Sequence, residues 1–183
     1  MKIDFTGKRV LVTGASGGIG RAICLEFSKS NAIIHAHYNS NKKEAEKTVQ
    51  LLSSKSHYLH QSDLSKPGDI KKMIDKIGQI DIVINNAAVV EQHDFDQLNY
   101  KEWENIWHKT IGANLMGPAY LMFLASKNMQ KNGGGKFINI SSRGAFRGEP
   151  KAPAYGASKA GLNALGQSMA CLLYTSPSPR DRG

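Results

Sequence analysis

The sequence predicts an α/β protein built on one doubly wound parallel β-sheet with helices on both faces. Short β-branched runs alternate with amphipathic helical patterns from the start of the chain. The runs "RVLVT" and "IDIVIN" are apolar on successive residues, as expected for strands covered on both faces. Right-handed crossovers then give the strand order 3-2-1-4-5. A length of 183 residues fits one domain of this kind.

Each element follows from a local pattern of apolar residues bounded by turn residues. The expected strands are Arg9–Thr13, Ala32–His37, His57–Gln61, Ile80–Asn85 and Lys136–Ser141. The expected helices are Gly18–Ser30, Lys42–Ser54, Pro67–Ile77, Tyr100–Gln130 and Ala154–Ala170, the fourth interrupted near Gly112, Gly117 and Pro118. In such a sheet, ligands bind at the carboxyl ends of the strands.

Composition excludes several classes of function. The formal charge is +9, but the basic residues are scattered, so we expect no nucleic-acid partner. The two cysteines, Cys24 and Cys171, make no disulfide framework, and the pair His35 and His37 is too small a set for a metal site. No apolar run reaches the length of a membrane span and the N-terminus lacks the apolar core of a signal peptide, so we expect a cytoplasmic protein without a membrane partner.

A glycine-rich turn follows the first strand. In "VLVTGASGGIGRAI" the glycines Gly14, Gly18 and Gly20 lie between an apolar strand and a helix. Such a turn lets the backbone approach a pyrophosphate, and the helix N-terminus offers unpaired N–H groups to that anion. A glycine-rich turn can also be only a turn, but its place in a β-α-β unit favours dinucleotide binding.

Polar residues end the next strands. Asp63, after the third strand, could accept from an adenine amino group or could cap the helix that starts near Pro67. Asn85 and Asn86 end the fourth strand, where two consecutive Asn residues suit a turn, but the small residues there would also let a cofactor lie across the sheet edge.

Three side chains of the fifth strand and the last helix suggest a catalytic set. Tyr155 and Lys159 are four residues apart and share one helix face, while Ser142 follows the fifth strand. Tyr38 and Lys42 have the same spacing, but they lie away from these groups, and we interpret that match as chance.

With "TGASGGIG", "DL", "NNAA", "SS" and "YGASK" in this order, residues 2 to about 170 resemble the short-chain dehydrogenase/reductase family. Within the family, the chain looks most like the 3-oxoacyl-[acyl-carrier-protein] reductase type. The resemblance implies that Tyr155 is the general acid, that Ser142 holds the substrate oxygen, and that Lys159 favours the phenolate and binds the ribose. It also implies that Asn114 supports a water relay to Lys159, although the residues alone would favour a satisfied kink residue. The implied cofactor-binding residues are Gly14, Ser16, Gly18, Ile19, Gly20, Asn39, Asp63, Leu64, Asn86, Ala87, Tyr155 and Lys159.

The expected cofactor is NADP, with NAD left open. NAD enzymes of this type usually carry an acidic residue at the end of the second strand, but Tyr38 stands there and the first carboxylate is Glu44. Asn39 and Ser40, with Lys42 and Lys43 nearby, would accommodate a 2′-phosphate. Against this, many NADP-preferring relatives have a basic residue where this chain has Gly17. Ala88 also replaces the glycine of the family's Asn-Asn-Ala-Gly motif.

The resemblance implies that the substrate is a small molecule or an acyl thioester. Arg143, Arg147 and Lys151 could favour an acidic carrier protein, although a solvated loop explains these charges equally well. A non-catalytic dinucleotide-binding protein is the alternative to an enzyme. A basic nucleic-acid-binding module would not explain polar residues at the strand ends.

The end of the sequence differs from the family pattern. Residues 171–183, "CLLYTSPSPRDRG", resemble a translated sequencing adapter, and we interpret them as a non-native tail on an incomplete domain of residues 1–170. The family's last strands and covering loop are then missing. We therefore expect a poorly soluble, inactive fragment of a reductase whose parent assembles as a dimer or tetramer.

Overall fold

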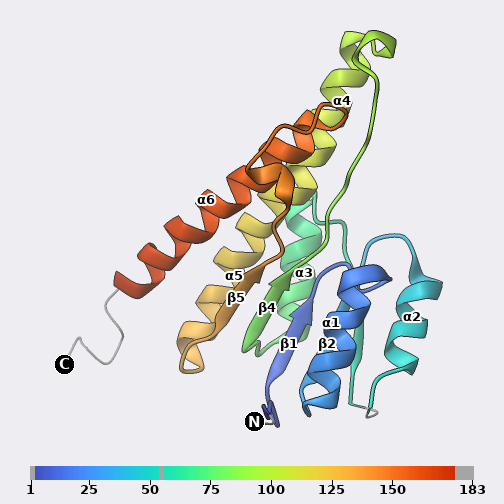
Figure 1. Ribbon diagram of the computed structural model, residues 1–183. Coiled ribbons are helices and arrows are strands. Elements are labelled where there is room, and N and C mark those ends of the chain that lie inside the picture. The colour runs from blue at the N-terminus through green and yellow to red at the C-terminus, as the bar shows by residue number, and fades with distance from the viewer. Residues whose placement is uncertain (1–2, 54–55, 176–183) are drawn as a thin grey trace.

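The computed structural model describes residues 3–53 and 56–175, with side chains to Leu173 (Figure 1). Its strands are β1 (Arg9–Val12), β2 (Ile33–Tyr38), β3 (Tyr58–Gln61), β4 (Ile82–Asn85) and β5 (Lys136–Asn139). Its α-helices are α1 (Gly18–Lys29), α2 (Lys42–Gln50), α3 (Pro67–Ile77), α4 (Tyr100–Ile111), α5 (Gly117–Lys131) and α6 (Pro153–Thr175). Most ends agree with the sequence prediction within one or two residues, but α2 ends at Gln50 rather than Ser54.

The five strands form one parallel sheet in the order β3-β2-β1-β4-β5, as the sequence predicted. Along β1, Val10 pairs with Ile34 of β2 on one side and with Ile82 of β4 on the other. The chain adds β2 and β3 on one side of β1 and then returns to add β4 and β5 on the other side, so β1 and β4 are neighbours. A crevice forms at their carboxyl ends in sheets of this topology.

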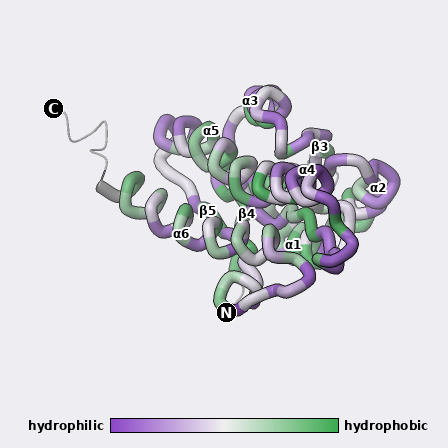
Figure 2. Tube along the Cα trace, turned by 90° about the horizontal axis from the view of Figure 1, so that it is seen from above, coloured by the Kyte–Doolittle hydropathy of each residue, from purple (hydrophilic) through white to green (hydrophobic). Residues whose placement is uncertain are grey.

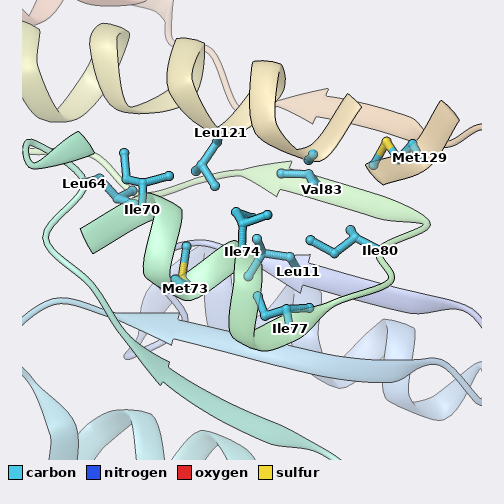
Figure 3. Close-up of a cluster of buried hydrophobic side chains, with 11 residues drawn as sticks. Leu11, Leu64, Ile70, Met73, Ile74, Ile77, Ile80, Val83, Leu121 and Met129 are labelled. Carbon is cyan, nitrogen blue, oxygen red and sulfur yellow. The ribbon is translucent and has the colours of Figure 1, made fainter. Parts of the chain in front are cut away.

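Two apolar clusters fill the spaces between the sheet and its helices. One cluster joins Leu11 and Val83 of the sheet to α3 and α5, through residues such as Ile74 and Leu121 (Figure 3). The other joins the opposite faces of β1, β2 and β4 to α1, through residues such as Cys24. Seen from above, hydrophilic residues mark the outer surface of α2 and the loops (Figure 2). Covering on both faces explains why the central strands lack apolar-polar alternation.

The expected long helix is divided by a π-helical turn at Gly112–Met116 between α4 and α5. Asn114 lies in this turn and is fully buried. π-turns often occur at functional sites because the extra residue redirects side chains. The interruption predicted from Gly112, Gly117 and Pro118 therefore has a defined structure.

The last helix continues beyond its predicted end. α6 extends to Thr175 instead of ending at Ala170, and it runs beside α5 over β5 (Figure 1). No residue before Pro177 removes a backbone N–H from the helix, which allows the extra turn. Residues 176–183 of the expected non-native tail lie outside the described residues. Its non-native origin stays a prediction.

None of the helices described is both long enough and apolar enough to cross a membrane. The described residues also contain no group of three or more His, Cys, Asp or Glu side chains that could hold a metal ion.

Candidate active site

The glycine turn packs against the end of β4 with no room for a side chain at Gly14 or Gly20. Gly14 has a φ of 71° and Gly18 a φ of 51°, a region that favours glycine. A Cβ on Gly20 would lie 2.1 Å from the carbonyl oxygen of Gly14, and a Cβ on Gly14 would lie 2.9 Å from the Cα of Ala87. Each of these glycines is therefore required by conformation or by close approach of the backbone.

Thr13 and Asn86 fasten this turn to the sheet. The Thr13 hydroxyl accepts hydrogen bonds from the backbone N–H groups of Asn86 at 2.9 Å and Ala87 at 3.0 Å. The Asn86 amide donates to the carbonyl oxygens of Thr13 at 2.8 Å and Gly14 at 3.2 Å. The predicted residue Asn86 thus shapes the turn directly, and Thr13 adds a second anchor that sequence reasoning missed.

A cavity of about 300 Å³ opens at the carboxyl ends of β1, β2 and β4, a volume in the range of small-molecule sites. Seven predicted cofactor-binding residues line it: Gly14, Ser16, Asn39, Asp63, Leu64, Asn86 and Ala87. Gly18, Ile19 and Gly20 belong to the adjoining turn and the start of α1 and do not line it, and neither do Tyr155 and Lys159. Six further residues complete the lining: His37, Ser40, Asn41, Ala88, Val89 and Ala113.

His37 is one of the lining residues that sequence reasoning did not place at the site. Its side chain is 1% exposed, with Nδ1 3.2 Å from the backbone nitrogen of Gly14 and Nε2 2.9 Å from the carbonyl oxygen of Ser62. Burial lowers the pKa of His37 to about 4. The sequence could have indicated His37, because side chains two positions apart along an extended strand point the same way and Asn39, two positions later, was a predicted site residue.

Asp63 does not cap α3, whose N-cap residue Lys66 has no side-chain capping hydrogen bond, but it stabilises the preceding turn. Oδ1 accepts from the backbone N–H of Ser65 at 3.0 Å and from its hydroxyl at 2.7 Å, which stabilises the turn before α3. The Ser65 hydroxyl is the main cause that lowers the pKa of Asp63. The carboxylate also lines the cavity, so a structural bond and a ligand contact are compatible.

Lys159 joins α6 to the end of β5. Its Nζ donates to the carbonyl oxygen of Ile140 at 2.7 Å, two residues before Ser142, and lies 5.8 Å from the ring centroid of Tyr155. The side chain is among the largest that are fully buried, and burial lowers the pKa of Lys159. The Ser142 hydroxyl accepts from the Gly144 N–H at 3.2 Å. The tertiary structure thus gathers the three predicted catalytic residues around the carboxyl end of β5.

Asn114 connects the cavity to α6. Its Oδ1 accepts from the backbone N–H of Val89 at 2.7 Å, and its Nδ2 donates to the Val89 carbonyl at 2.8 Å and to the Ser158 hydroxyl at 3.1 Å. Ser158 in turn donates to the backbone carbonyl of Tyr155 at 2.7 Å. Asn114 therefore holds a cavity wall and the Tyr155 turn in one network, while the water relay to Lys159 stays a prediction.

Comparisons with known proteins agree with this geometry. A family model described as short chain dehydrogenase matches residues 8–176. A Thermotoga maritima protein named as an uncharacterized oxidoreductase is 32% identical over 173 residues, covering 92% of this chain and 66% of the relative. A Staphylococcus aureus 3-oxoacyl-[acyl-carrier-protein] reductase is 30% identical, covering 89% of this chain and 67% of that protein. The chain thus spans about two thirds of the length of these curated relatives.

Solved structures show the same fold. A short chain dehydrogenase/reductase family protein superposes with a TM-score of 0.83 at 24% identity, over 95% of this chain and 71% of that one. The match of the family model over nearly the whole described chain, together with the sheet order and the glycine turn, identifies the chain as a member of the short-chain dehydrogenase/reductase family of oxidoreductases.

Proposed function

We propose that the protein transfers a hydride between NADP(H) and a carbonyl or secondary alcohol substrate. The observation that carries this proposal is the buried Lys159 ammonium group, anchored on the Ile140 carbonyl beside the Tyr155 ring at the strand end that carries Ser142. A purely structural lysine would not need burial beside a tyrosine ring. Desolvating such a cation is costly.

The cavity would hold one part of a nicotinamide dinucleotide, a group that the family uses, with the nicotinamide extending toward Tyr155 and Lys159. The glycine turn and the N-terminus of α1 would present backbone N–H groups to a pyrophosphate, and small residues such as Ala87 and Ala88 leave space at the sheet edge. Asp63 would accept from the adenine, and Lys159 would contact the ribose hydroxyls. When bound, the dihydronicotinamide supplies the hydride and its oxidised form accepts one.

The protein side chains supply the proton that the reduction requires. Reduction of a ketone creates an alkoxide, and the Tyr155 hydroxyl would donate its proton as the charge develops. The Lys159 ammonium group nearby stabilises the phenolate that remains. The Ser142 hydroxyl would donate to the substrate oxygen and hold it in line. Asn114 supports this geometry through Ser158, which binds the Tyr155 carbonyl.

Neutral residues around the ribose end of the cavity support the choice of NADP over NAD. His37, Asn39, Ser40 and Asn41 supply no carboxylate that would repel a 2′-phosphate. Lys42 and Lys43 do not line the cavity, and Lys42 lies 3.6 Å from Glu46. The polar side chains and backbone of residues 39–41, rather than the two lysines, would accommodate the phosphate.

The leading substrate class is a 3-oxoacyl thioester, supported by the name of the Staphylococcus aureus relative. A cytoplasmic location and a homo-oligomeric parent protein belong to the same proposal.

The test compares an intact version of the protein with the same protein carrying Tyr155→Phe. NADPH binding is measured by fluorescence, and NADPH oxidation is measured with a panel of ketones and 3-oxoacyl thioesters. We expect Tyr155→Phe to leave binding nearly unchanged and to abolish turnover, whereas Tyr100→Phe, at an 80% exposed position, changes neither. Retained turnover in Tyr155→Phe would refute the proposed role. NADPH binding without turnover by the unmodified chain would favour a non-catalytic dinucleotide-binding protein or an inactive fragment.

A further inference from the structure

We infer that His37 is a positioning residue that fixes two walls of the dinucleotide cavity at once, the glycine turn and the segment after β3. This inference rests on the proposed function and gives His37 a role in cofactor binding that the proposed mechanism does not include. His37 is the penultimate residue of β2, the strand between β1 and β3. Its ring can therefore reach both neighbouring strand ends.

The two hydrogen bonds of the imidazole determine its tautomer. The backbone N–H of Gly14 can only donate, so Nδ1 of His37 must accept and carries no proton. The carbonyl of Ser62 can only accept, so Nε2 must carry the proton. A neutral ring protonated at Nε2 is the state that satisfies both bonds, and the lowered pKa of the buried ring agrees with it.

Each bond holds a different part of the proposed cofactor site. Gly14 begins the turn that would approach the pyrophosphate, and Ser62 directly precedes Asp63 and Leu64, which line the other wall. The two anchors follow different strands, Gly14 after β1 and Ser62 after β3, and the His37 side chain joins them. A residue of another shape would leave one wall without its hydrogen bond.

The arrangement also bears on the ribose. Both ring nitrogens of His37 are occupied by backbone groups, so the ring has no remaining donor or acceptor for a ribose 2′-OH. His37 therefore shapes the cavity without binding the ribose by a hydrogen bond. An acidic residue near this point would serve NAD instead.

Two amide variants separate the two bonds. His37→Asn places an amide oxygen near the Nδ1 position and keeps the acceptor for Gly14, whereas His37→Gln places an amide nitrogen near the Nε2 position and keeps the donor for Ser62. The probes are NADPH and 2′,5′-ADP, which retains the adenosine end and lacks the pyrophosphate bridge. His108→Gln, on the exposed surface of α4, is the control.

We expect His37→Gln to weaken NADPH binding about tenfold and 2′,5′-ADP binding less than threefold, because only the wall facing the bridge is released. We expect His37→Asn to weaken both ligands about tenfold, and His108→Gln to change neither. Equal losses for both ligands in both amide variants, or no loss, would overturn the inference while leaving the proposed function intact. If the unmodified chain binds neither probe, the proposed function fails as well.

A measurement on the unmodified chain covers the case in which the variants do not fold. We expect ¹⁵N NMR of the His37 ring to show a proton on Nε2 and both ring nitrogen resonances to shift when NADPH is added. A proton on Nδ1, or ring resonances that do not respond to bound NADPH, would overturn the inference.

Discussion

Replacing Gly20 by alanine tests the close packing of the glycine turn. The new Cβ would lie 2.1 Å from the Gly14 carbonyl oxygen and 2.7 Å from the Asn86 Nδ2, where ordinary contact begins at 3.4 Å. The carbonyl must therefore move by about 1 Å, and it is backbone that cannot rotate away. Overpacking of this kind costs about 1–3 kcal/mol, and the rigid neighbour favours the upper end.

Thermal unfolding and NADPH binding measure this effect. For a chain of this size, a loss of about 3 kcal/mol lowers the Tm by about 6–12 °C. The displaced Gly14 carbonyl also loses its bond from Asn86, so we expect NADPH affinity to fall at least about tenfold.

Gly17→Ala is the matched control in the same loop. Its Cβ would meet nothing within 4 Å, and its φ of 172° is extended backbone that any residue adopts. We expect a change in unfolding free energy within about 1 kcal/mol and little change in affinity. The steric reasoning is refuted if Gly20→Ala unfolds and binds NADPH like Gly17→Ala.

Three further outcomes are expected. Burial is the main cause that lowers the pKa values of His35 and His60 to about 4, with added repulsion from His60 on His35 and from Lys76 on His60. The folded state therefore binds fewer protons than the unfolded state between pH 4 and about 6.5. The free energy of unfolding should therefore fall as pH drops through that window, by up to about 1.4 kcal/mol per pH unit per imidazole. Equal urea midpoints at pH 7 and pH 5 would contradict this. The control His108→Gln should show the same difference between the two midpoints as the unmodified chain. Asn114→Ala removes three hydrogen bonds from a fully buried site and should lower the free energy of unfolding in urea by about 2–4 kcal/mol. A decrease below about 1 kcal/mol would count against the proposed network. Thr13→Val removes the acceptor of the Ala87 N–H and one of two acceptors of the Asn86 N–H, which also donates to the Ile84 carbonyl at 3.1 Å. It should cost about 1–3 kcal/mol with weaker NADPH binding, whereas unchanged unfolding would show that neither bond to Thr13 matters.

Local patterns in the sequence predicted the elements and much of the site. The apolar runs of β1 and β4 indicated strands covered on both faces, and the handedness of β-α-β crossovers then determined the strand order. The glycines at 14, 18 and 20 indicated a turn with close backbone contacts, which the structure shows at Gly14 and Gly20. These features depend on neighbours in sequence or on general rules of chain geometry.

Two ends of elements could not be predicted in this way. α2 ends four residues before its expected limit, with a turn through Leu51 and Leu52 in place of a further helical turn. α6 extends to Thr175 because no residue before Pro177 prevents it, although the composition changes earlier. Helix ends depend on tertiary contacts and on capping, which residue patterns determine only weakly.

The sequence by itself determined the strands, their order and the residue types available for chemistry, because periodicity and crossover handedness are local properties. Only the tertiary structure decided which atoms meet: His37 between Gly14 and Ser62, Lys159 on the Ile140 carbonyl, and Asn114 between Val89 and Ser158. Each of these contacts joins residues about 20 or more positions apart. Such partners are chosen by packing of the complete sheet and its helices, and no local pattern in the sequence encodes them.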